Sequence, residues 1–168
     1  YSSSLNSLVV DKQDNLVFTG YTDGHDLKLN PNSETIFDTG INSGSSFMVK
    51  LDTNGNFVFG NIYNYVYNMA CTIDLDNNII STGNYTNYPP QFLTDLDPNP
   101  NAVFYLPPPS GLFVMKNTSA GAFSWARPLH AHNTPSIHAV KTDHNKNIII
   151  LGNFEAYLKI DNNSFPST

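Results

Sequence analysis

The sequence predicts an all-β fold made of β-propeller blades, each with four antiparallel strands. Three observations predict it: an internal repeat of about 65 residues, short apolar runs joined by Asp/Asn-rich turns, and no window with the apolar spacing of a helix. A β-solenoid with large coils is the alternative architecture. It is the weaker of the two, because solenoid coils seldom contain two tight hairpins each.

The first repeated block is an apolar run, an Asp-x-x-x-Asn turn and a second apolar run that ends in Gly. It occupies residues 10–20, 73–83 and 142–152, with Asp, Asn and Gly at the same relative positions in all three copies. Asp and Asn suit such a turn because their short side chains bond nearby backbone amides and tolerate left-handed geometry. The block therefore predicts one hairpin in each unit.

A second block predicts a second hairpin. Residues 47–50 and 55–59 return as residues 113–116 and 121–125, at a shift of 66 positions. A third, looser block lies between the first two and comprises residues 29–32, 96–99 and 160–163. Two hairpins per unit give the four strands of a propeller blade.

The spacing of the blocks divides the chain into three units. Residues 1–66 form the first predicted blade, residues 67–133 the second, with inserted aromatic and proline-rich loops, and residues 134–168 a partial third. A propeller ring needs about four blades or more to close. We therefore expect the chain to be a segment of a larger propeller.

Taken together, these blocks resemble the SBBP-type β-propeller repeats. The resemblance is carried by the Asp-x-x-x-Asn hairpin that ends in Thr-Gly, by Leu-Asp-Pro-Asn, by Phe-Val-x-Lys and by the Gly-x-Phe/Trp hairpin, and it covers most of the chain. It implies a large secreted or surface-attached bacterial protein. Phe59 departs from the family, which tends to have Trp there, whereas Trp125 keeps it. The motifs are structural, so they imply a fold and a location rather than an activity.

Composition limits the classes of function. Charged residues are only 13% of the chain and the formal net charge is −6, which argues against a nucleic-acid partner because such binders need a basic surface. The longest apolar run, residues 148–151, is far too short for a membrane-spanning helix. We expect an extracellular or cell-surface location. The expected partners are carbohydrate or protein at that surface, and further blades of the same chain or self-association.

Two Asp/Asn turns present side-chain oxygens at alternate positions, as calcium-binding loops do. The candidate calcium ligands are Asp52, Asn54, Asn56, Asp74, Asp76 and Asn78. Neither turn continues into the glycine and distal glutamate of an EF-hand, and tight hairpins favour the same residue types. The sequence thus leaves a structural turn and a calcium site as alternatives, and it predicts no other cofactor.

The least repetitive stretch lies in the second unit and is rich in aromatic residues and proline. Loops on rigid scaffolds often carry function, and aromatic rings held by proline make preorganised surfaces for sugars or peptides. The candidate ligand-binding residues are Tyr85, Tyr88, Phe92, Phe104 and Tyr105. The alternative is that these rings pack over the edge of the sheet.

No catalytic motif stands out, and we predict that the chain is not an enzyme. The acidic residues mostly belong to the repeat, which leaves a non-catalytic scaffold or binding module as the expected function. The alternatives are part of a propeller enzyme whose catalytic residues lie mainly in other blades, and a structural subunit of a cell-surface assembly. Cys71 aligns with the apolar Leu8 and Val140 of the other units, so we expect Cys71 to face the core.

Overall fold

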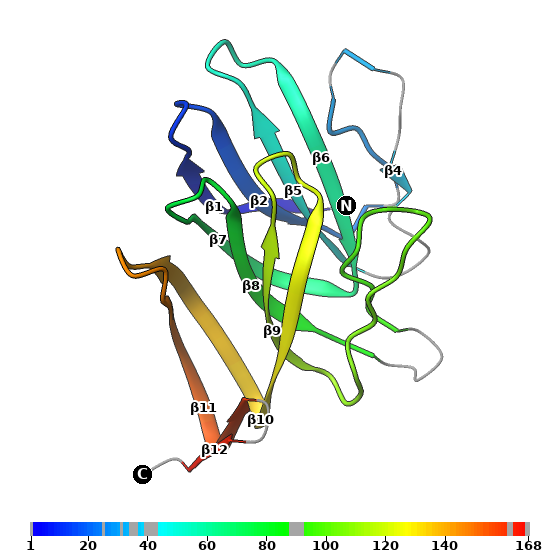
Figure 1. Ribbon diagram of the computed structural model, residues 1–168. Coiled ribbons are helices and arrows are strands. Elements are labelled where there is room, and N and C mark those ends of the chain that lie inside the picture. Colours follow the sequence, from blue (N-terminus) through cyan, green and yellow to red (C-terminus); the bar gives the residue numbers. More distant parts are fainter. Residues whose placement is uncertain are drawn as a thin grey trace.

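The computed structural model describes residues 2–24, 26–30, 32–33, 37–38, 44–87, 93–160 and 163–166. These residues form antiparallel β-strands, and none of them lies in a helix that is long and apolar enough to cross a membrane (Figure 1). The strands are β1 (Ser3–Val10), β2 (Leu16–Thr22), β3 (Asp26–Leu27), β4 (Phe37–Asp38), β5 (Ser45–Leu51), β6 (Phe57–Asn64), β7 (Val66–Ile73), β8 (Ile79–Tyr85), β9 (Gly111–Asn117), β10 (Phe123–Thr142), β11 (Ile148–Ile160) and β12 (Asn163–Pro166).

The main strands form two sheets, in which sequential strands are neighbours. The first sheet has the order β1-β2-β5-β6 and contains both hairpins of the first unit. The second has the order β12-β11-β10-β9-β8-β7. The predicted all-β class is therefore confirmed, and the antiparallel four-strand unit is consistent with a propeller segment.

The long strand β10 belongs to two units at once. Its first part, up to Leu129, pairs with β9, and its later part, from Leu129 to Thr142, pairs with β11. It therefore runs across the predicted boundary at 133/134, and units two and three share one sheet. The boundaries between the predicted blades stay predictions.

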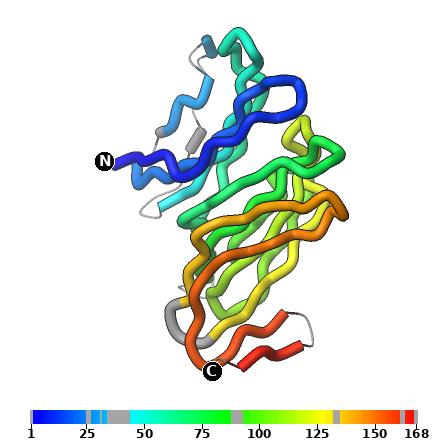
Figure 2. The backbone as a smooth tube through the Cα atoms, turned by 90° about the vertical axis from the view of Figure 1, so that its left-hand side faces the viewer, coloured from blue at the N-terminus to red at the C-terminus, as the bar shows by residue number. Residues whose placement is uncertain are grey.

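The first strand of each unit lies beside the first strand of the next. Strand β7 contacts both β1 and β10, and Figure 2 shows β1, β7 and the β10–β11 hairpin following one another down the molecule. Radial repetition in a propeller brings the first strands of successive blades together in this way.

Two apolar cores lie between the units. In the first core, Val17 and Met48 from unit one pack with Cys71 and Phe113 from unit two. In the second, side chains of β8, β9 and β10 pack together, and Ile148 and Ile150 of β11 lie against them. Both cores thus contain side chains from two units, so each unit depends on its neighbour for part of its core.

The prediction that Cys71 faces the core is confirmed, but the equivalent position is not buried in every unit. Cys71 and Val140 are 3% and 2% exposed, whereas Leu8 is 63% exposed. Burial raises the pKa of the Cys71 thiol. The equivalent faces of units two and three are covered by the preceding unit, but no described residues cover that face of unit one.

Candidate functional site

The connection between β8 and β9 is a folded loop held by buried polar groups. The side chain of Asn87 donates a hydrogen bond to the Leu106 carbonyl (3.0 Å) and accepts one from the Thr94 amide (2.8 Å). The Thr94 hydroxyl donates to the Thr86 carbonyl at 3.0 Å. Asn87 and Thr94 are both buried, so these bonds fix the loop against the body of the protein.

The same loop folds back on itself around Asp95. The Asp95 carboxylate accepts hydrogen bonds from the backbone amides of Asp97 (3.0 Å) and Phe104 (2.7 Å). Asp95 also forms a β-bridge with Tyr105, and Leu96 and Leu106 on either side are buried in the first core. The loop is therefore anchored by apolar side chains as well as by hydrogen bonds.

This anchored loop exposes three large apolar side chains, which we call the loop patch: Leu93, Val103 and Tyr105. They are 40%, 62% and 52% exposed, respectively. Asp95 pairs with Tyr105, and Leu93 and Val103 each lie two positions from one of these partners. All three side chains therefore lie at this bridge or within two positions of it, close together in one loop.

The structure assigns different positions to the predicted ligand-binding residues. Tyr85 is buried, its hydroxyl donates to the Pro107 carbonyl at 2.8 Å, and burial raises its pKa to about 12. Phe104 packs against Phe123, with ring centroids 4.9 Å apart. Only Tyr105, among the described members of the predicted set, presents its ring mainly to solvent. The other two, Tyr88 and Phe92, lie outside the described residues, and the binding role of the set stays a prediction.

Sequence reasoning missed Leu93 and Val103, because the search in this loop considered only aromatic residues. The sequence signal that could have identified them is their position in the inserted stretch of the second unit. Leu93 lies two residues before Asp95, and Val103 lies two residues before Tyr105. Exposed apolar side chains that gather in one place mark candidate interaction sites, and both side chains are exposed.

The first predicted calcium turn is closed by its own hydrogen bonds. One Asp52 carboxylate oxygen accepts from the backbone amides of Asn54 and Asn56, each at 2.8 Å, and the other accepts from the Asn56 side-chain amide at 2.9 Å. The side-chain bond from Asn56 is the main reason that the pKa of Asp52 is lowered. These bonds are those of a structural turn, and the calcium alternative stays a prediction.

The second predicted calcium turn has the same bonds and two lysine partners in addition. Asp74 accepts from the backbone amide of Asn78 at 2.8 Å and pairs with Lys116 at 2.8 Å. Asp76, at the exposed tip, pairs with Lys146 at 2.8 Å. Within the described ranges, no three His, Cys, Asp or Glu side chains are grouped so that they could hold a metal ion.

The repeated Asp forms an ion pair with the repeated Lys of the same unit. Asp11 lies 2.7 Å from Lys50, and both side chains are nearly fully buried. Asp74 pairs with Lys116 in the same way, although that lysine is partly exposed. The third copy, Asp143, keeps its turn bonds to Asn147, but no described lysine forms an ion pair with it.

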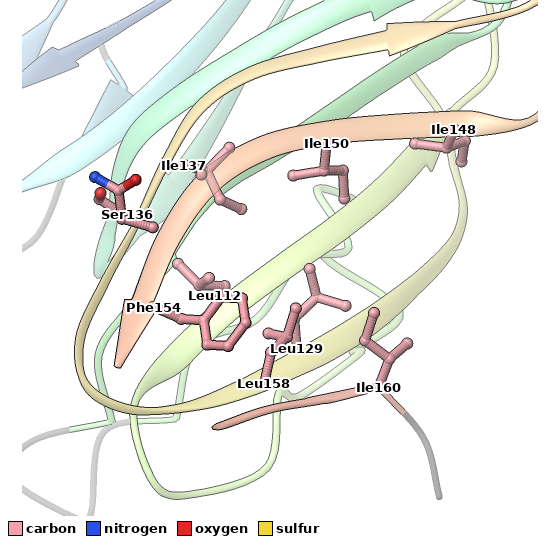
Figure 3. Close-up of a pocket in the computed structure, with 11 residues that line it drawn as sticks. Leu112, Leu129, Ser136, Ile137, Ile148, Ile150, Phe154, Leu158 and Ile160 are labelled. Atoms are coloured by element: carbon pink, nitrogen blue, oxygen red, sulfur yellow. The ribbon is translucent and has the colours of Figure 1, made fainter. Parts of the chain in front are cut away.

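A second surface feature is an apolar cavity of about 280 Å³ between units two and three. Figure 3 shows apolar side chains from β9, β10 and β11 pointing into it. Its lining includes Leu112, Leu129, Ile137, Ile150, Phe154 and Leu158, together with the backbone of Gly152. From the sequence, residues 148–151 are recognised only as the longest apolar run and as part of the first repeated block, and neither observation predicts this cavity.

Comparison with known proteins shows a distant similarity to a WD-repeat protein. The chain is 29% identical over 117 residues to an uncharacterized WD repeat-containing protein of Acanthamoeba polyphaga mimivirus. The match covers 63% of this chain and spans only 8% of that protein. No family model matches the chain, so the SBBP-type resemblance stays a prediction. The similarity to a WD-repeat protein suggests a β-propeller type, in agreement with the observed fold.

Proposed function

We propose that the chain is a non-catalytic propeller segment that binds another protein through the loop patch of its second unit. The observation that carries the proposal is the combination of rigidity and exposure in the β8–β9 loop. Buried Asn87 and Thr94 fix the loop, while Val103 and Tyr105 stay more than half exposed. A preorganised loop loses little conformational entropy on binding, so exposed apolar side chains on it favour association.

The name of the viral relative supports a protein partner over a small-molecule substrate, since a WD-repeat protein suggests a propeller-type binding or scaffold module. The patch is mainly aliphatic, which also favours a protein surface over the hydroxyl-rich surface of a carbohydrate. A location outside the cell or at its surface, in a bacterial protein of the SBBP type, completes the proposal. Its support is the low lysine content and the repeat motifs.

The test compares three forms of the chain as immobilised baits. They are the wild type, the loop variant Val103→Ser/Tyr105→Ser, and the control Val58→Ser, which changes a side chain that is 49% exposed outside the loop. Proteins retained from the source organism are quantified by mass spectrometry, and urea unfolding of each bait checks that the fold is intact. We expect a set of partners that the wild type and the control retain and the loop variant loses.

Equal retention by all three baits would contradict the proposal, because the loop patch would then contribute nothing to binding. A glycan array probed with the same three forms examines the alternative ligand. Suppose that the wild type binds a glycan, that the loop variant does not, and that no retained protein depends on the loop patch. The ligand would then be a carbohydrate and not a protein.

A further inference from the structure

We propose that the open edge of β11 accepts an extended strand that carries Phe-x-x-Lys, with the Phe in the cavity beside Gly152 and the Lys paired with Asp143. This site is separate from the loop patch and does not depend on it. The proposal rests on three features of the described part of the third unit: a strand edge without a strand partner, an apolar cavity, and an Asp without an ion-pair partner. Each is occupied in units one and two by a strand of that sequence.

The first feature is the edge itself. Strands β2 and β8 are each paired on both sides, β2 with β1 and β5, and β8 with β7 and β9. Residues 148–153 of β11 pair only with β10, because β12 pairs with residues 157–160 further along. Among the described residues, their outward backbone groups therefore have no strand partner, and such an edge is a template for an added strand.

The second feature is the cavity. In units one and two, the Phe of the third main strand lies opposite the repeated glycine: Phe47 opposite Gly20, and Phe113 opposite Gly83. Both Phe rings are buried and lie against the space that the glycine leaves open. The third glycine, Gly152, lines the cavity of about 280 Å³ (Figure 3). Cavities of about 150 Å³ hold benzene, so a phenyl ring fits there.

The third feature is Asp143. In units one and two, the Lys of the third main strand lies opposite the second residue of the neighbouring strand. Lys50 of β5 lies opposite Val17 of β2, and Lys116 of β9 lies opposite Ile80 of β8. From that register both lysines reach the turn Asp of their own unit. The same register on β11 places a lysine opposite Ile149, within reach of Asp143. A single added strand with the sequence Phe-x-x-Lys thus pairs with the edge of β11, fills the cavity with its Phe and forms an ion pair between its Lys and Asp143.

The described parts of the chain do not supply this strand to a second copy. Strands β5 and β9, which carry the two Phe-x-x-Lys sequences, are each hydrogen-bonded to a strand on both sides. Either one would have to leave its own sheet to donate to another molecule. The occupant we propose is therefore a strand of this chemistry from another protein, added to the edge of β11.

The experiment uses a fluorescein-labelled peptide with the sequence of residues 110–118, which contains β9, and measures its anisotropy with the full chain. We expect saturable binding. Replacing the peptide's Phe by Ala lowers the affinity roughly tenfold or more, since a buried ring is lost. Replacing its Lys by Met lowers it roughly threefold, as for a partly exposed ion pair. In the protein variant Asp143→Asn, the Lys and Met peptides bind equally, while the effect of the Phe remains.

Two controls make the result decisive. A peptide of the same composition in scrambled order measures non-specific association with the apolar edge, and sedimentation measures whether the chain associates with itself. Absence of saturable binding, or binding that ignores both the peptide's Phe and Asp143, would overturn the proposal. A dimer that Ile149→Lys abolishes, with no peptide binding, would identify a second copy as the occupant and would overturn it equally.

Discussion

The Asp11–Lys50 pair connects the two hairpins of the first unit from within the protein. Asp11 lies in the turn of the first hairpin and Lys50 on β5 of the second, at 2.7 Å, and the Lys50 ammonium also donates to the Ser119 carbonyl of unit two at 3.0 Å. Buried charges are tolerated only when paired, so each partner depends on the other. The repeat thus keeps Asp and Lys for a structural reason.

We predict that Asp11→Asn destabilises the protein by about 3–5 kcal/mol, because it leaves Lys50 buried without a counter-charge. Asn keeps the oxygen that accepts the two backbone bonds of the turn but loses the bond from the Asn15 side-chain amide, a loss that the control Asp143→Asn shares through Asn147. The double variant Asp11→Asn/Lys50→Met should recover most of the loss. Urea unfolding measures these differences in the free energy of unfolding. The control Asp143→Asn, at the same repeat position without a lysine, should have a much smaller effect; equal effects at both positions would contradict the account.

The turn carboxylates also predict how stability depends on pH. Burial raises the pKa of Asp11, but hydrogen bonds from Lys50 and Asn15 outweigh it and hold that pKa well below the ordinary 3.8. The pKa of Asp74 is lowered in the same way by Lys116 and Asn78. The folded state therefore binds fewer protons than the unfolded state, and these groups stabilise it fully only above the unfolded pKa.

We accordingly expect the free energy of unfolding to be level above about pH 5 and to fall as the pH drops through 3.8 toward the folded pKa values. Urea titrations at a series of pH values provide the measurement. In Asp11→Asn/Lys50→Met the fall should be shallower, because one of the shifted carboxyls is gone. A curve of unchanged steepness in that variant would show that other groups govern acid unfolding.

At the scale of the strand, the repeated glycine lets the first strand of a unit lie close to the second. A Cβ on Gly20, Gly83 or Gly152 would come within 3.0 Å of a backbone carbonyl oxygen. Those oxygens belong to Ser4, Tyr67 and Ser136. Each lies next to a register shift in the first strand, where an irregularity brings the backbone nearer. The glycine is therefore required by backbone contact, which no side-chain adjustment relieves.

We predict that Gly83→Ala destabilises the protein by about 1–3 kcal/mol through overpacking against the Tyr67 carbonyl. The matched control is Gly60→Ala, whose nearest neighbour is the end of the Leu29 side chain, which can rotate away. Thermal and urea unfolding of the two variants give the comparison. A cost for Gly60→Ala as large as that for Gly83→Ala would show that glycine acts here through backbone entropy instead of contact.

The hairpins could be predicted from the sequence because their signals are local. The Asp-x-x-x-Asn block specifies a turn by side-chain bonds within five residues, and the structure has those bonds at Asp11, Asp52, Asp74 and Asp143. Exposure was harder to predict, because it depends on which unit covers which face. The repeat alignment places Leu8 and Cys71 at one position, yet the Leu8 side chain is solvent-exposed while Cys71 is buried. Tyr85 and Phe104, predicted to bind ligand, likewise pack into the body of the protein.

At the scale of the whole molecule, the two outer units each present an apolar face. On β1 the exposed side chains are Leu5, Leu8 and Val10, and on β11 they are Ile149 and Leu151. Val17 and Ile80 occupy the repeat position of Ile149 in units one and two. Both lie between units and are buried. Burial at a given repeat position thus depends on the presence of a neighbouring unit, and the same side chain changes its energetic role from unit to unit.

This dependence gives a prediction at one repeat position in two units. Val140→Ala removes two methyl groups from the second core and should destabilise the protein by about 1–3 kcal/mol. Leu8→Ala removes more apolar volume at the equivalent, 63% exposed position and should change the free energy of unfolding by less than about 0.5 kcal/mol. Similar losses of stability for Leu8→Ala and Val140→Ala would mean that Leu8 is covered in solution, and that the face of β1 already has a partner.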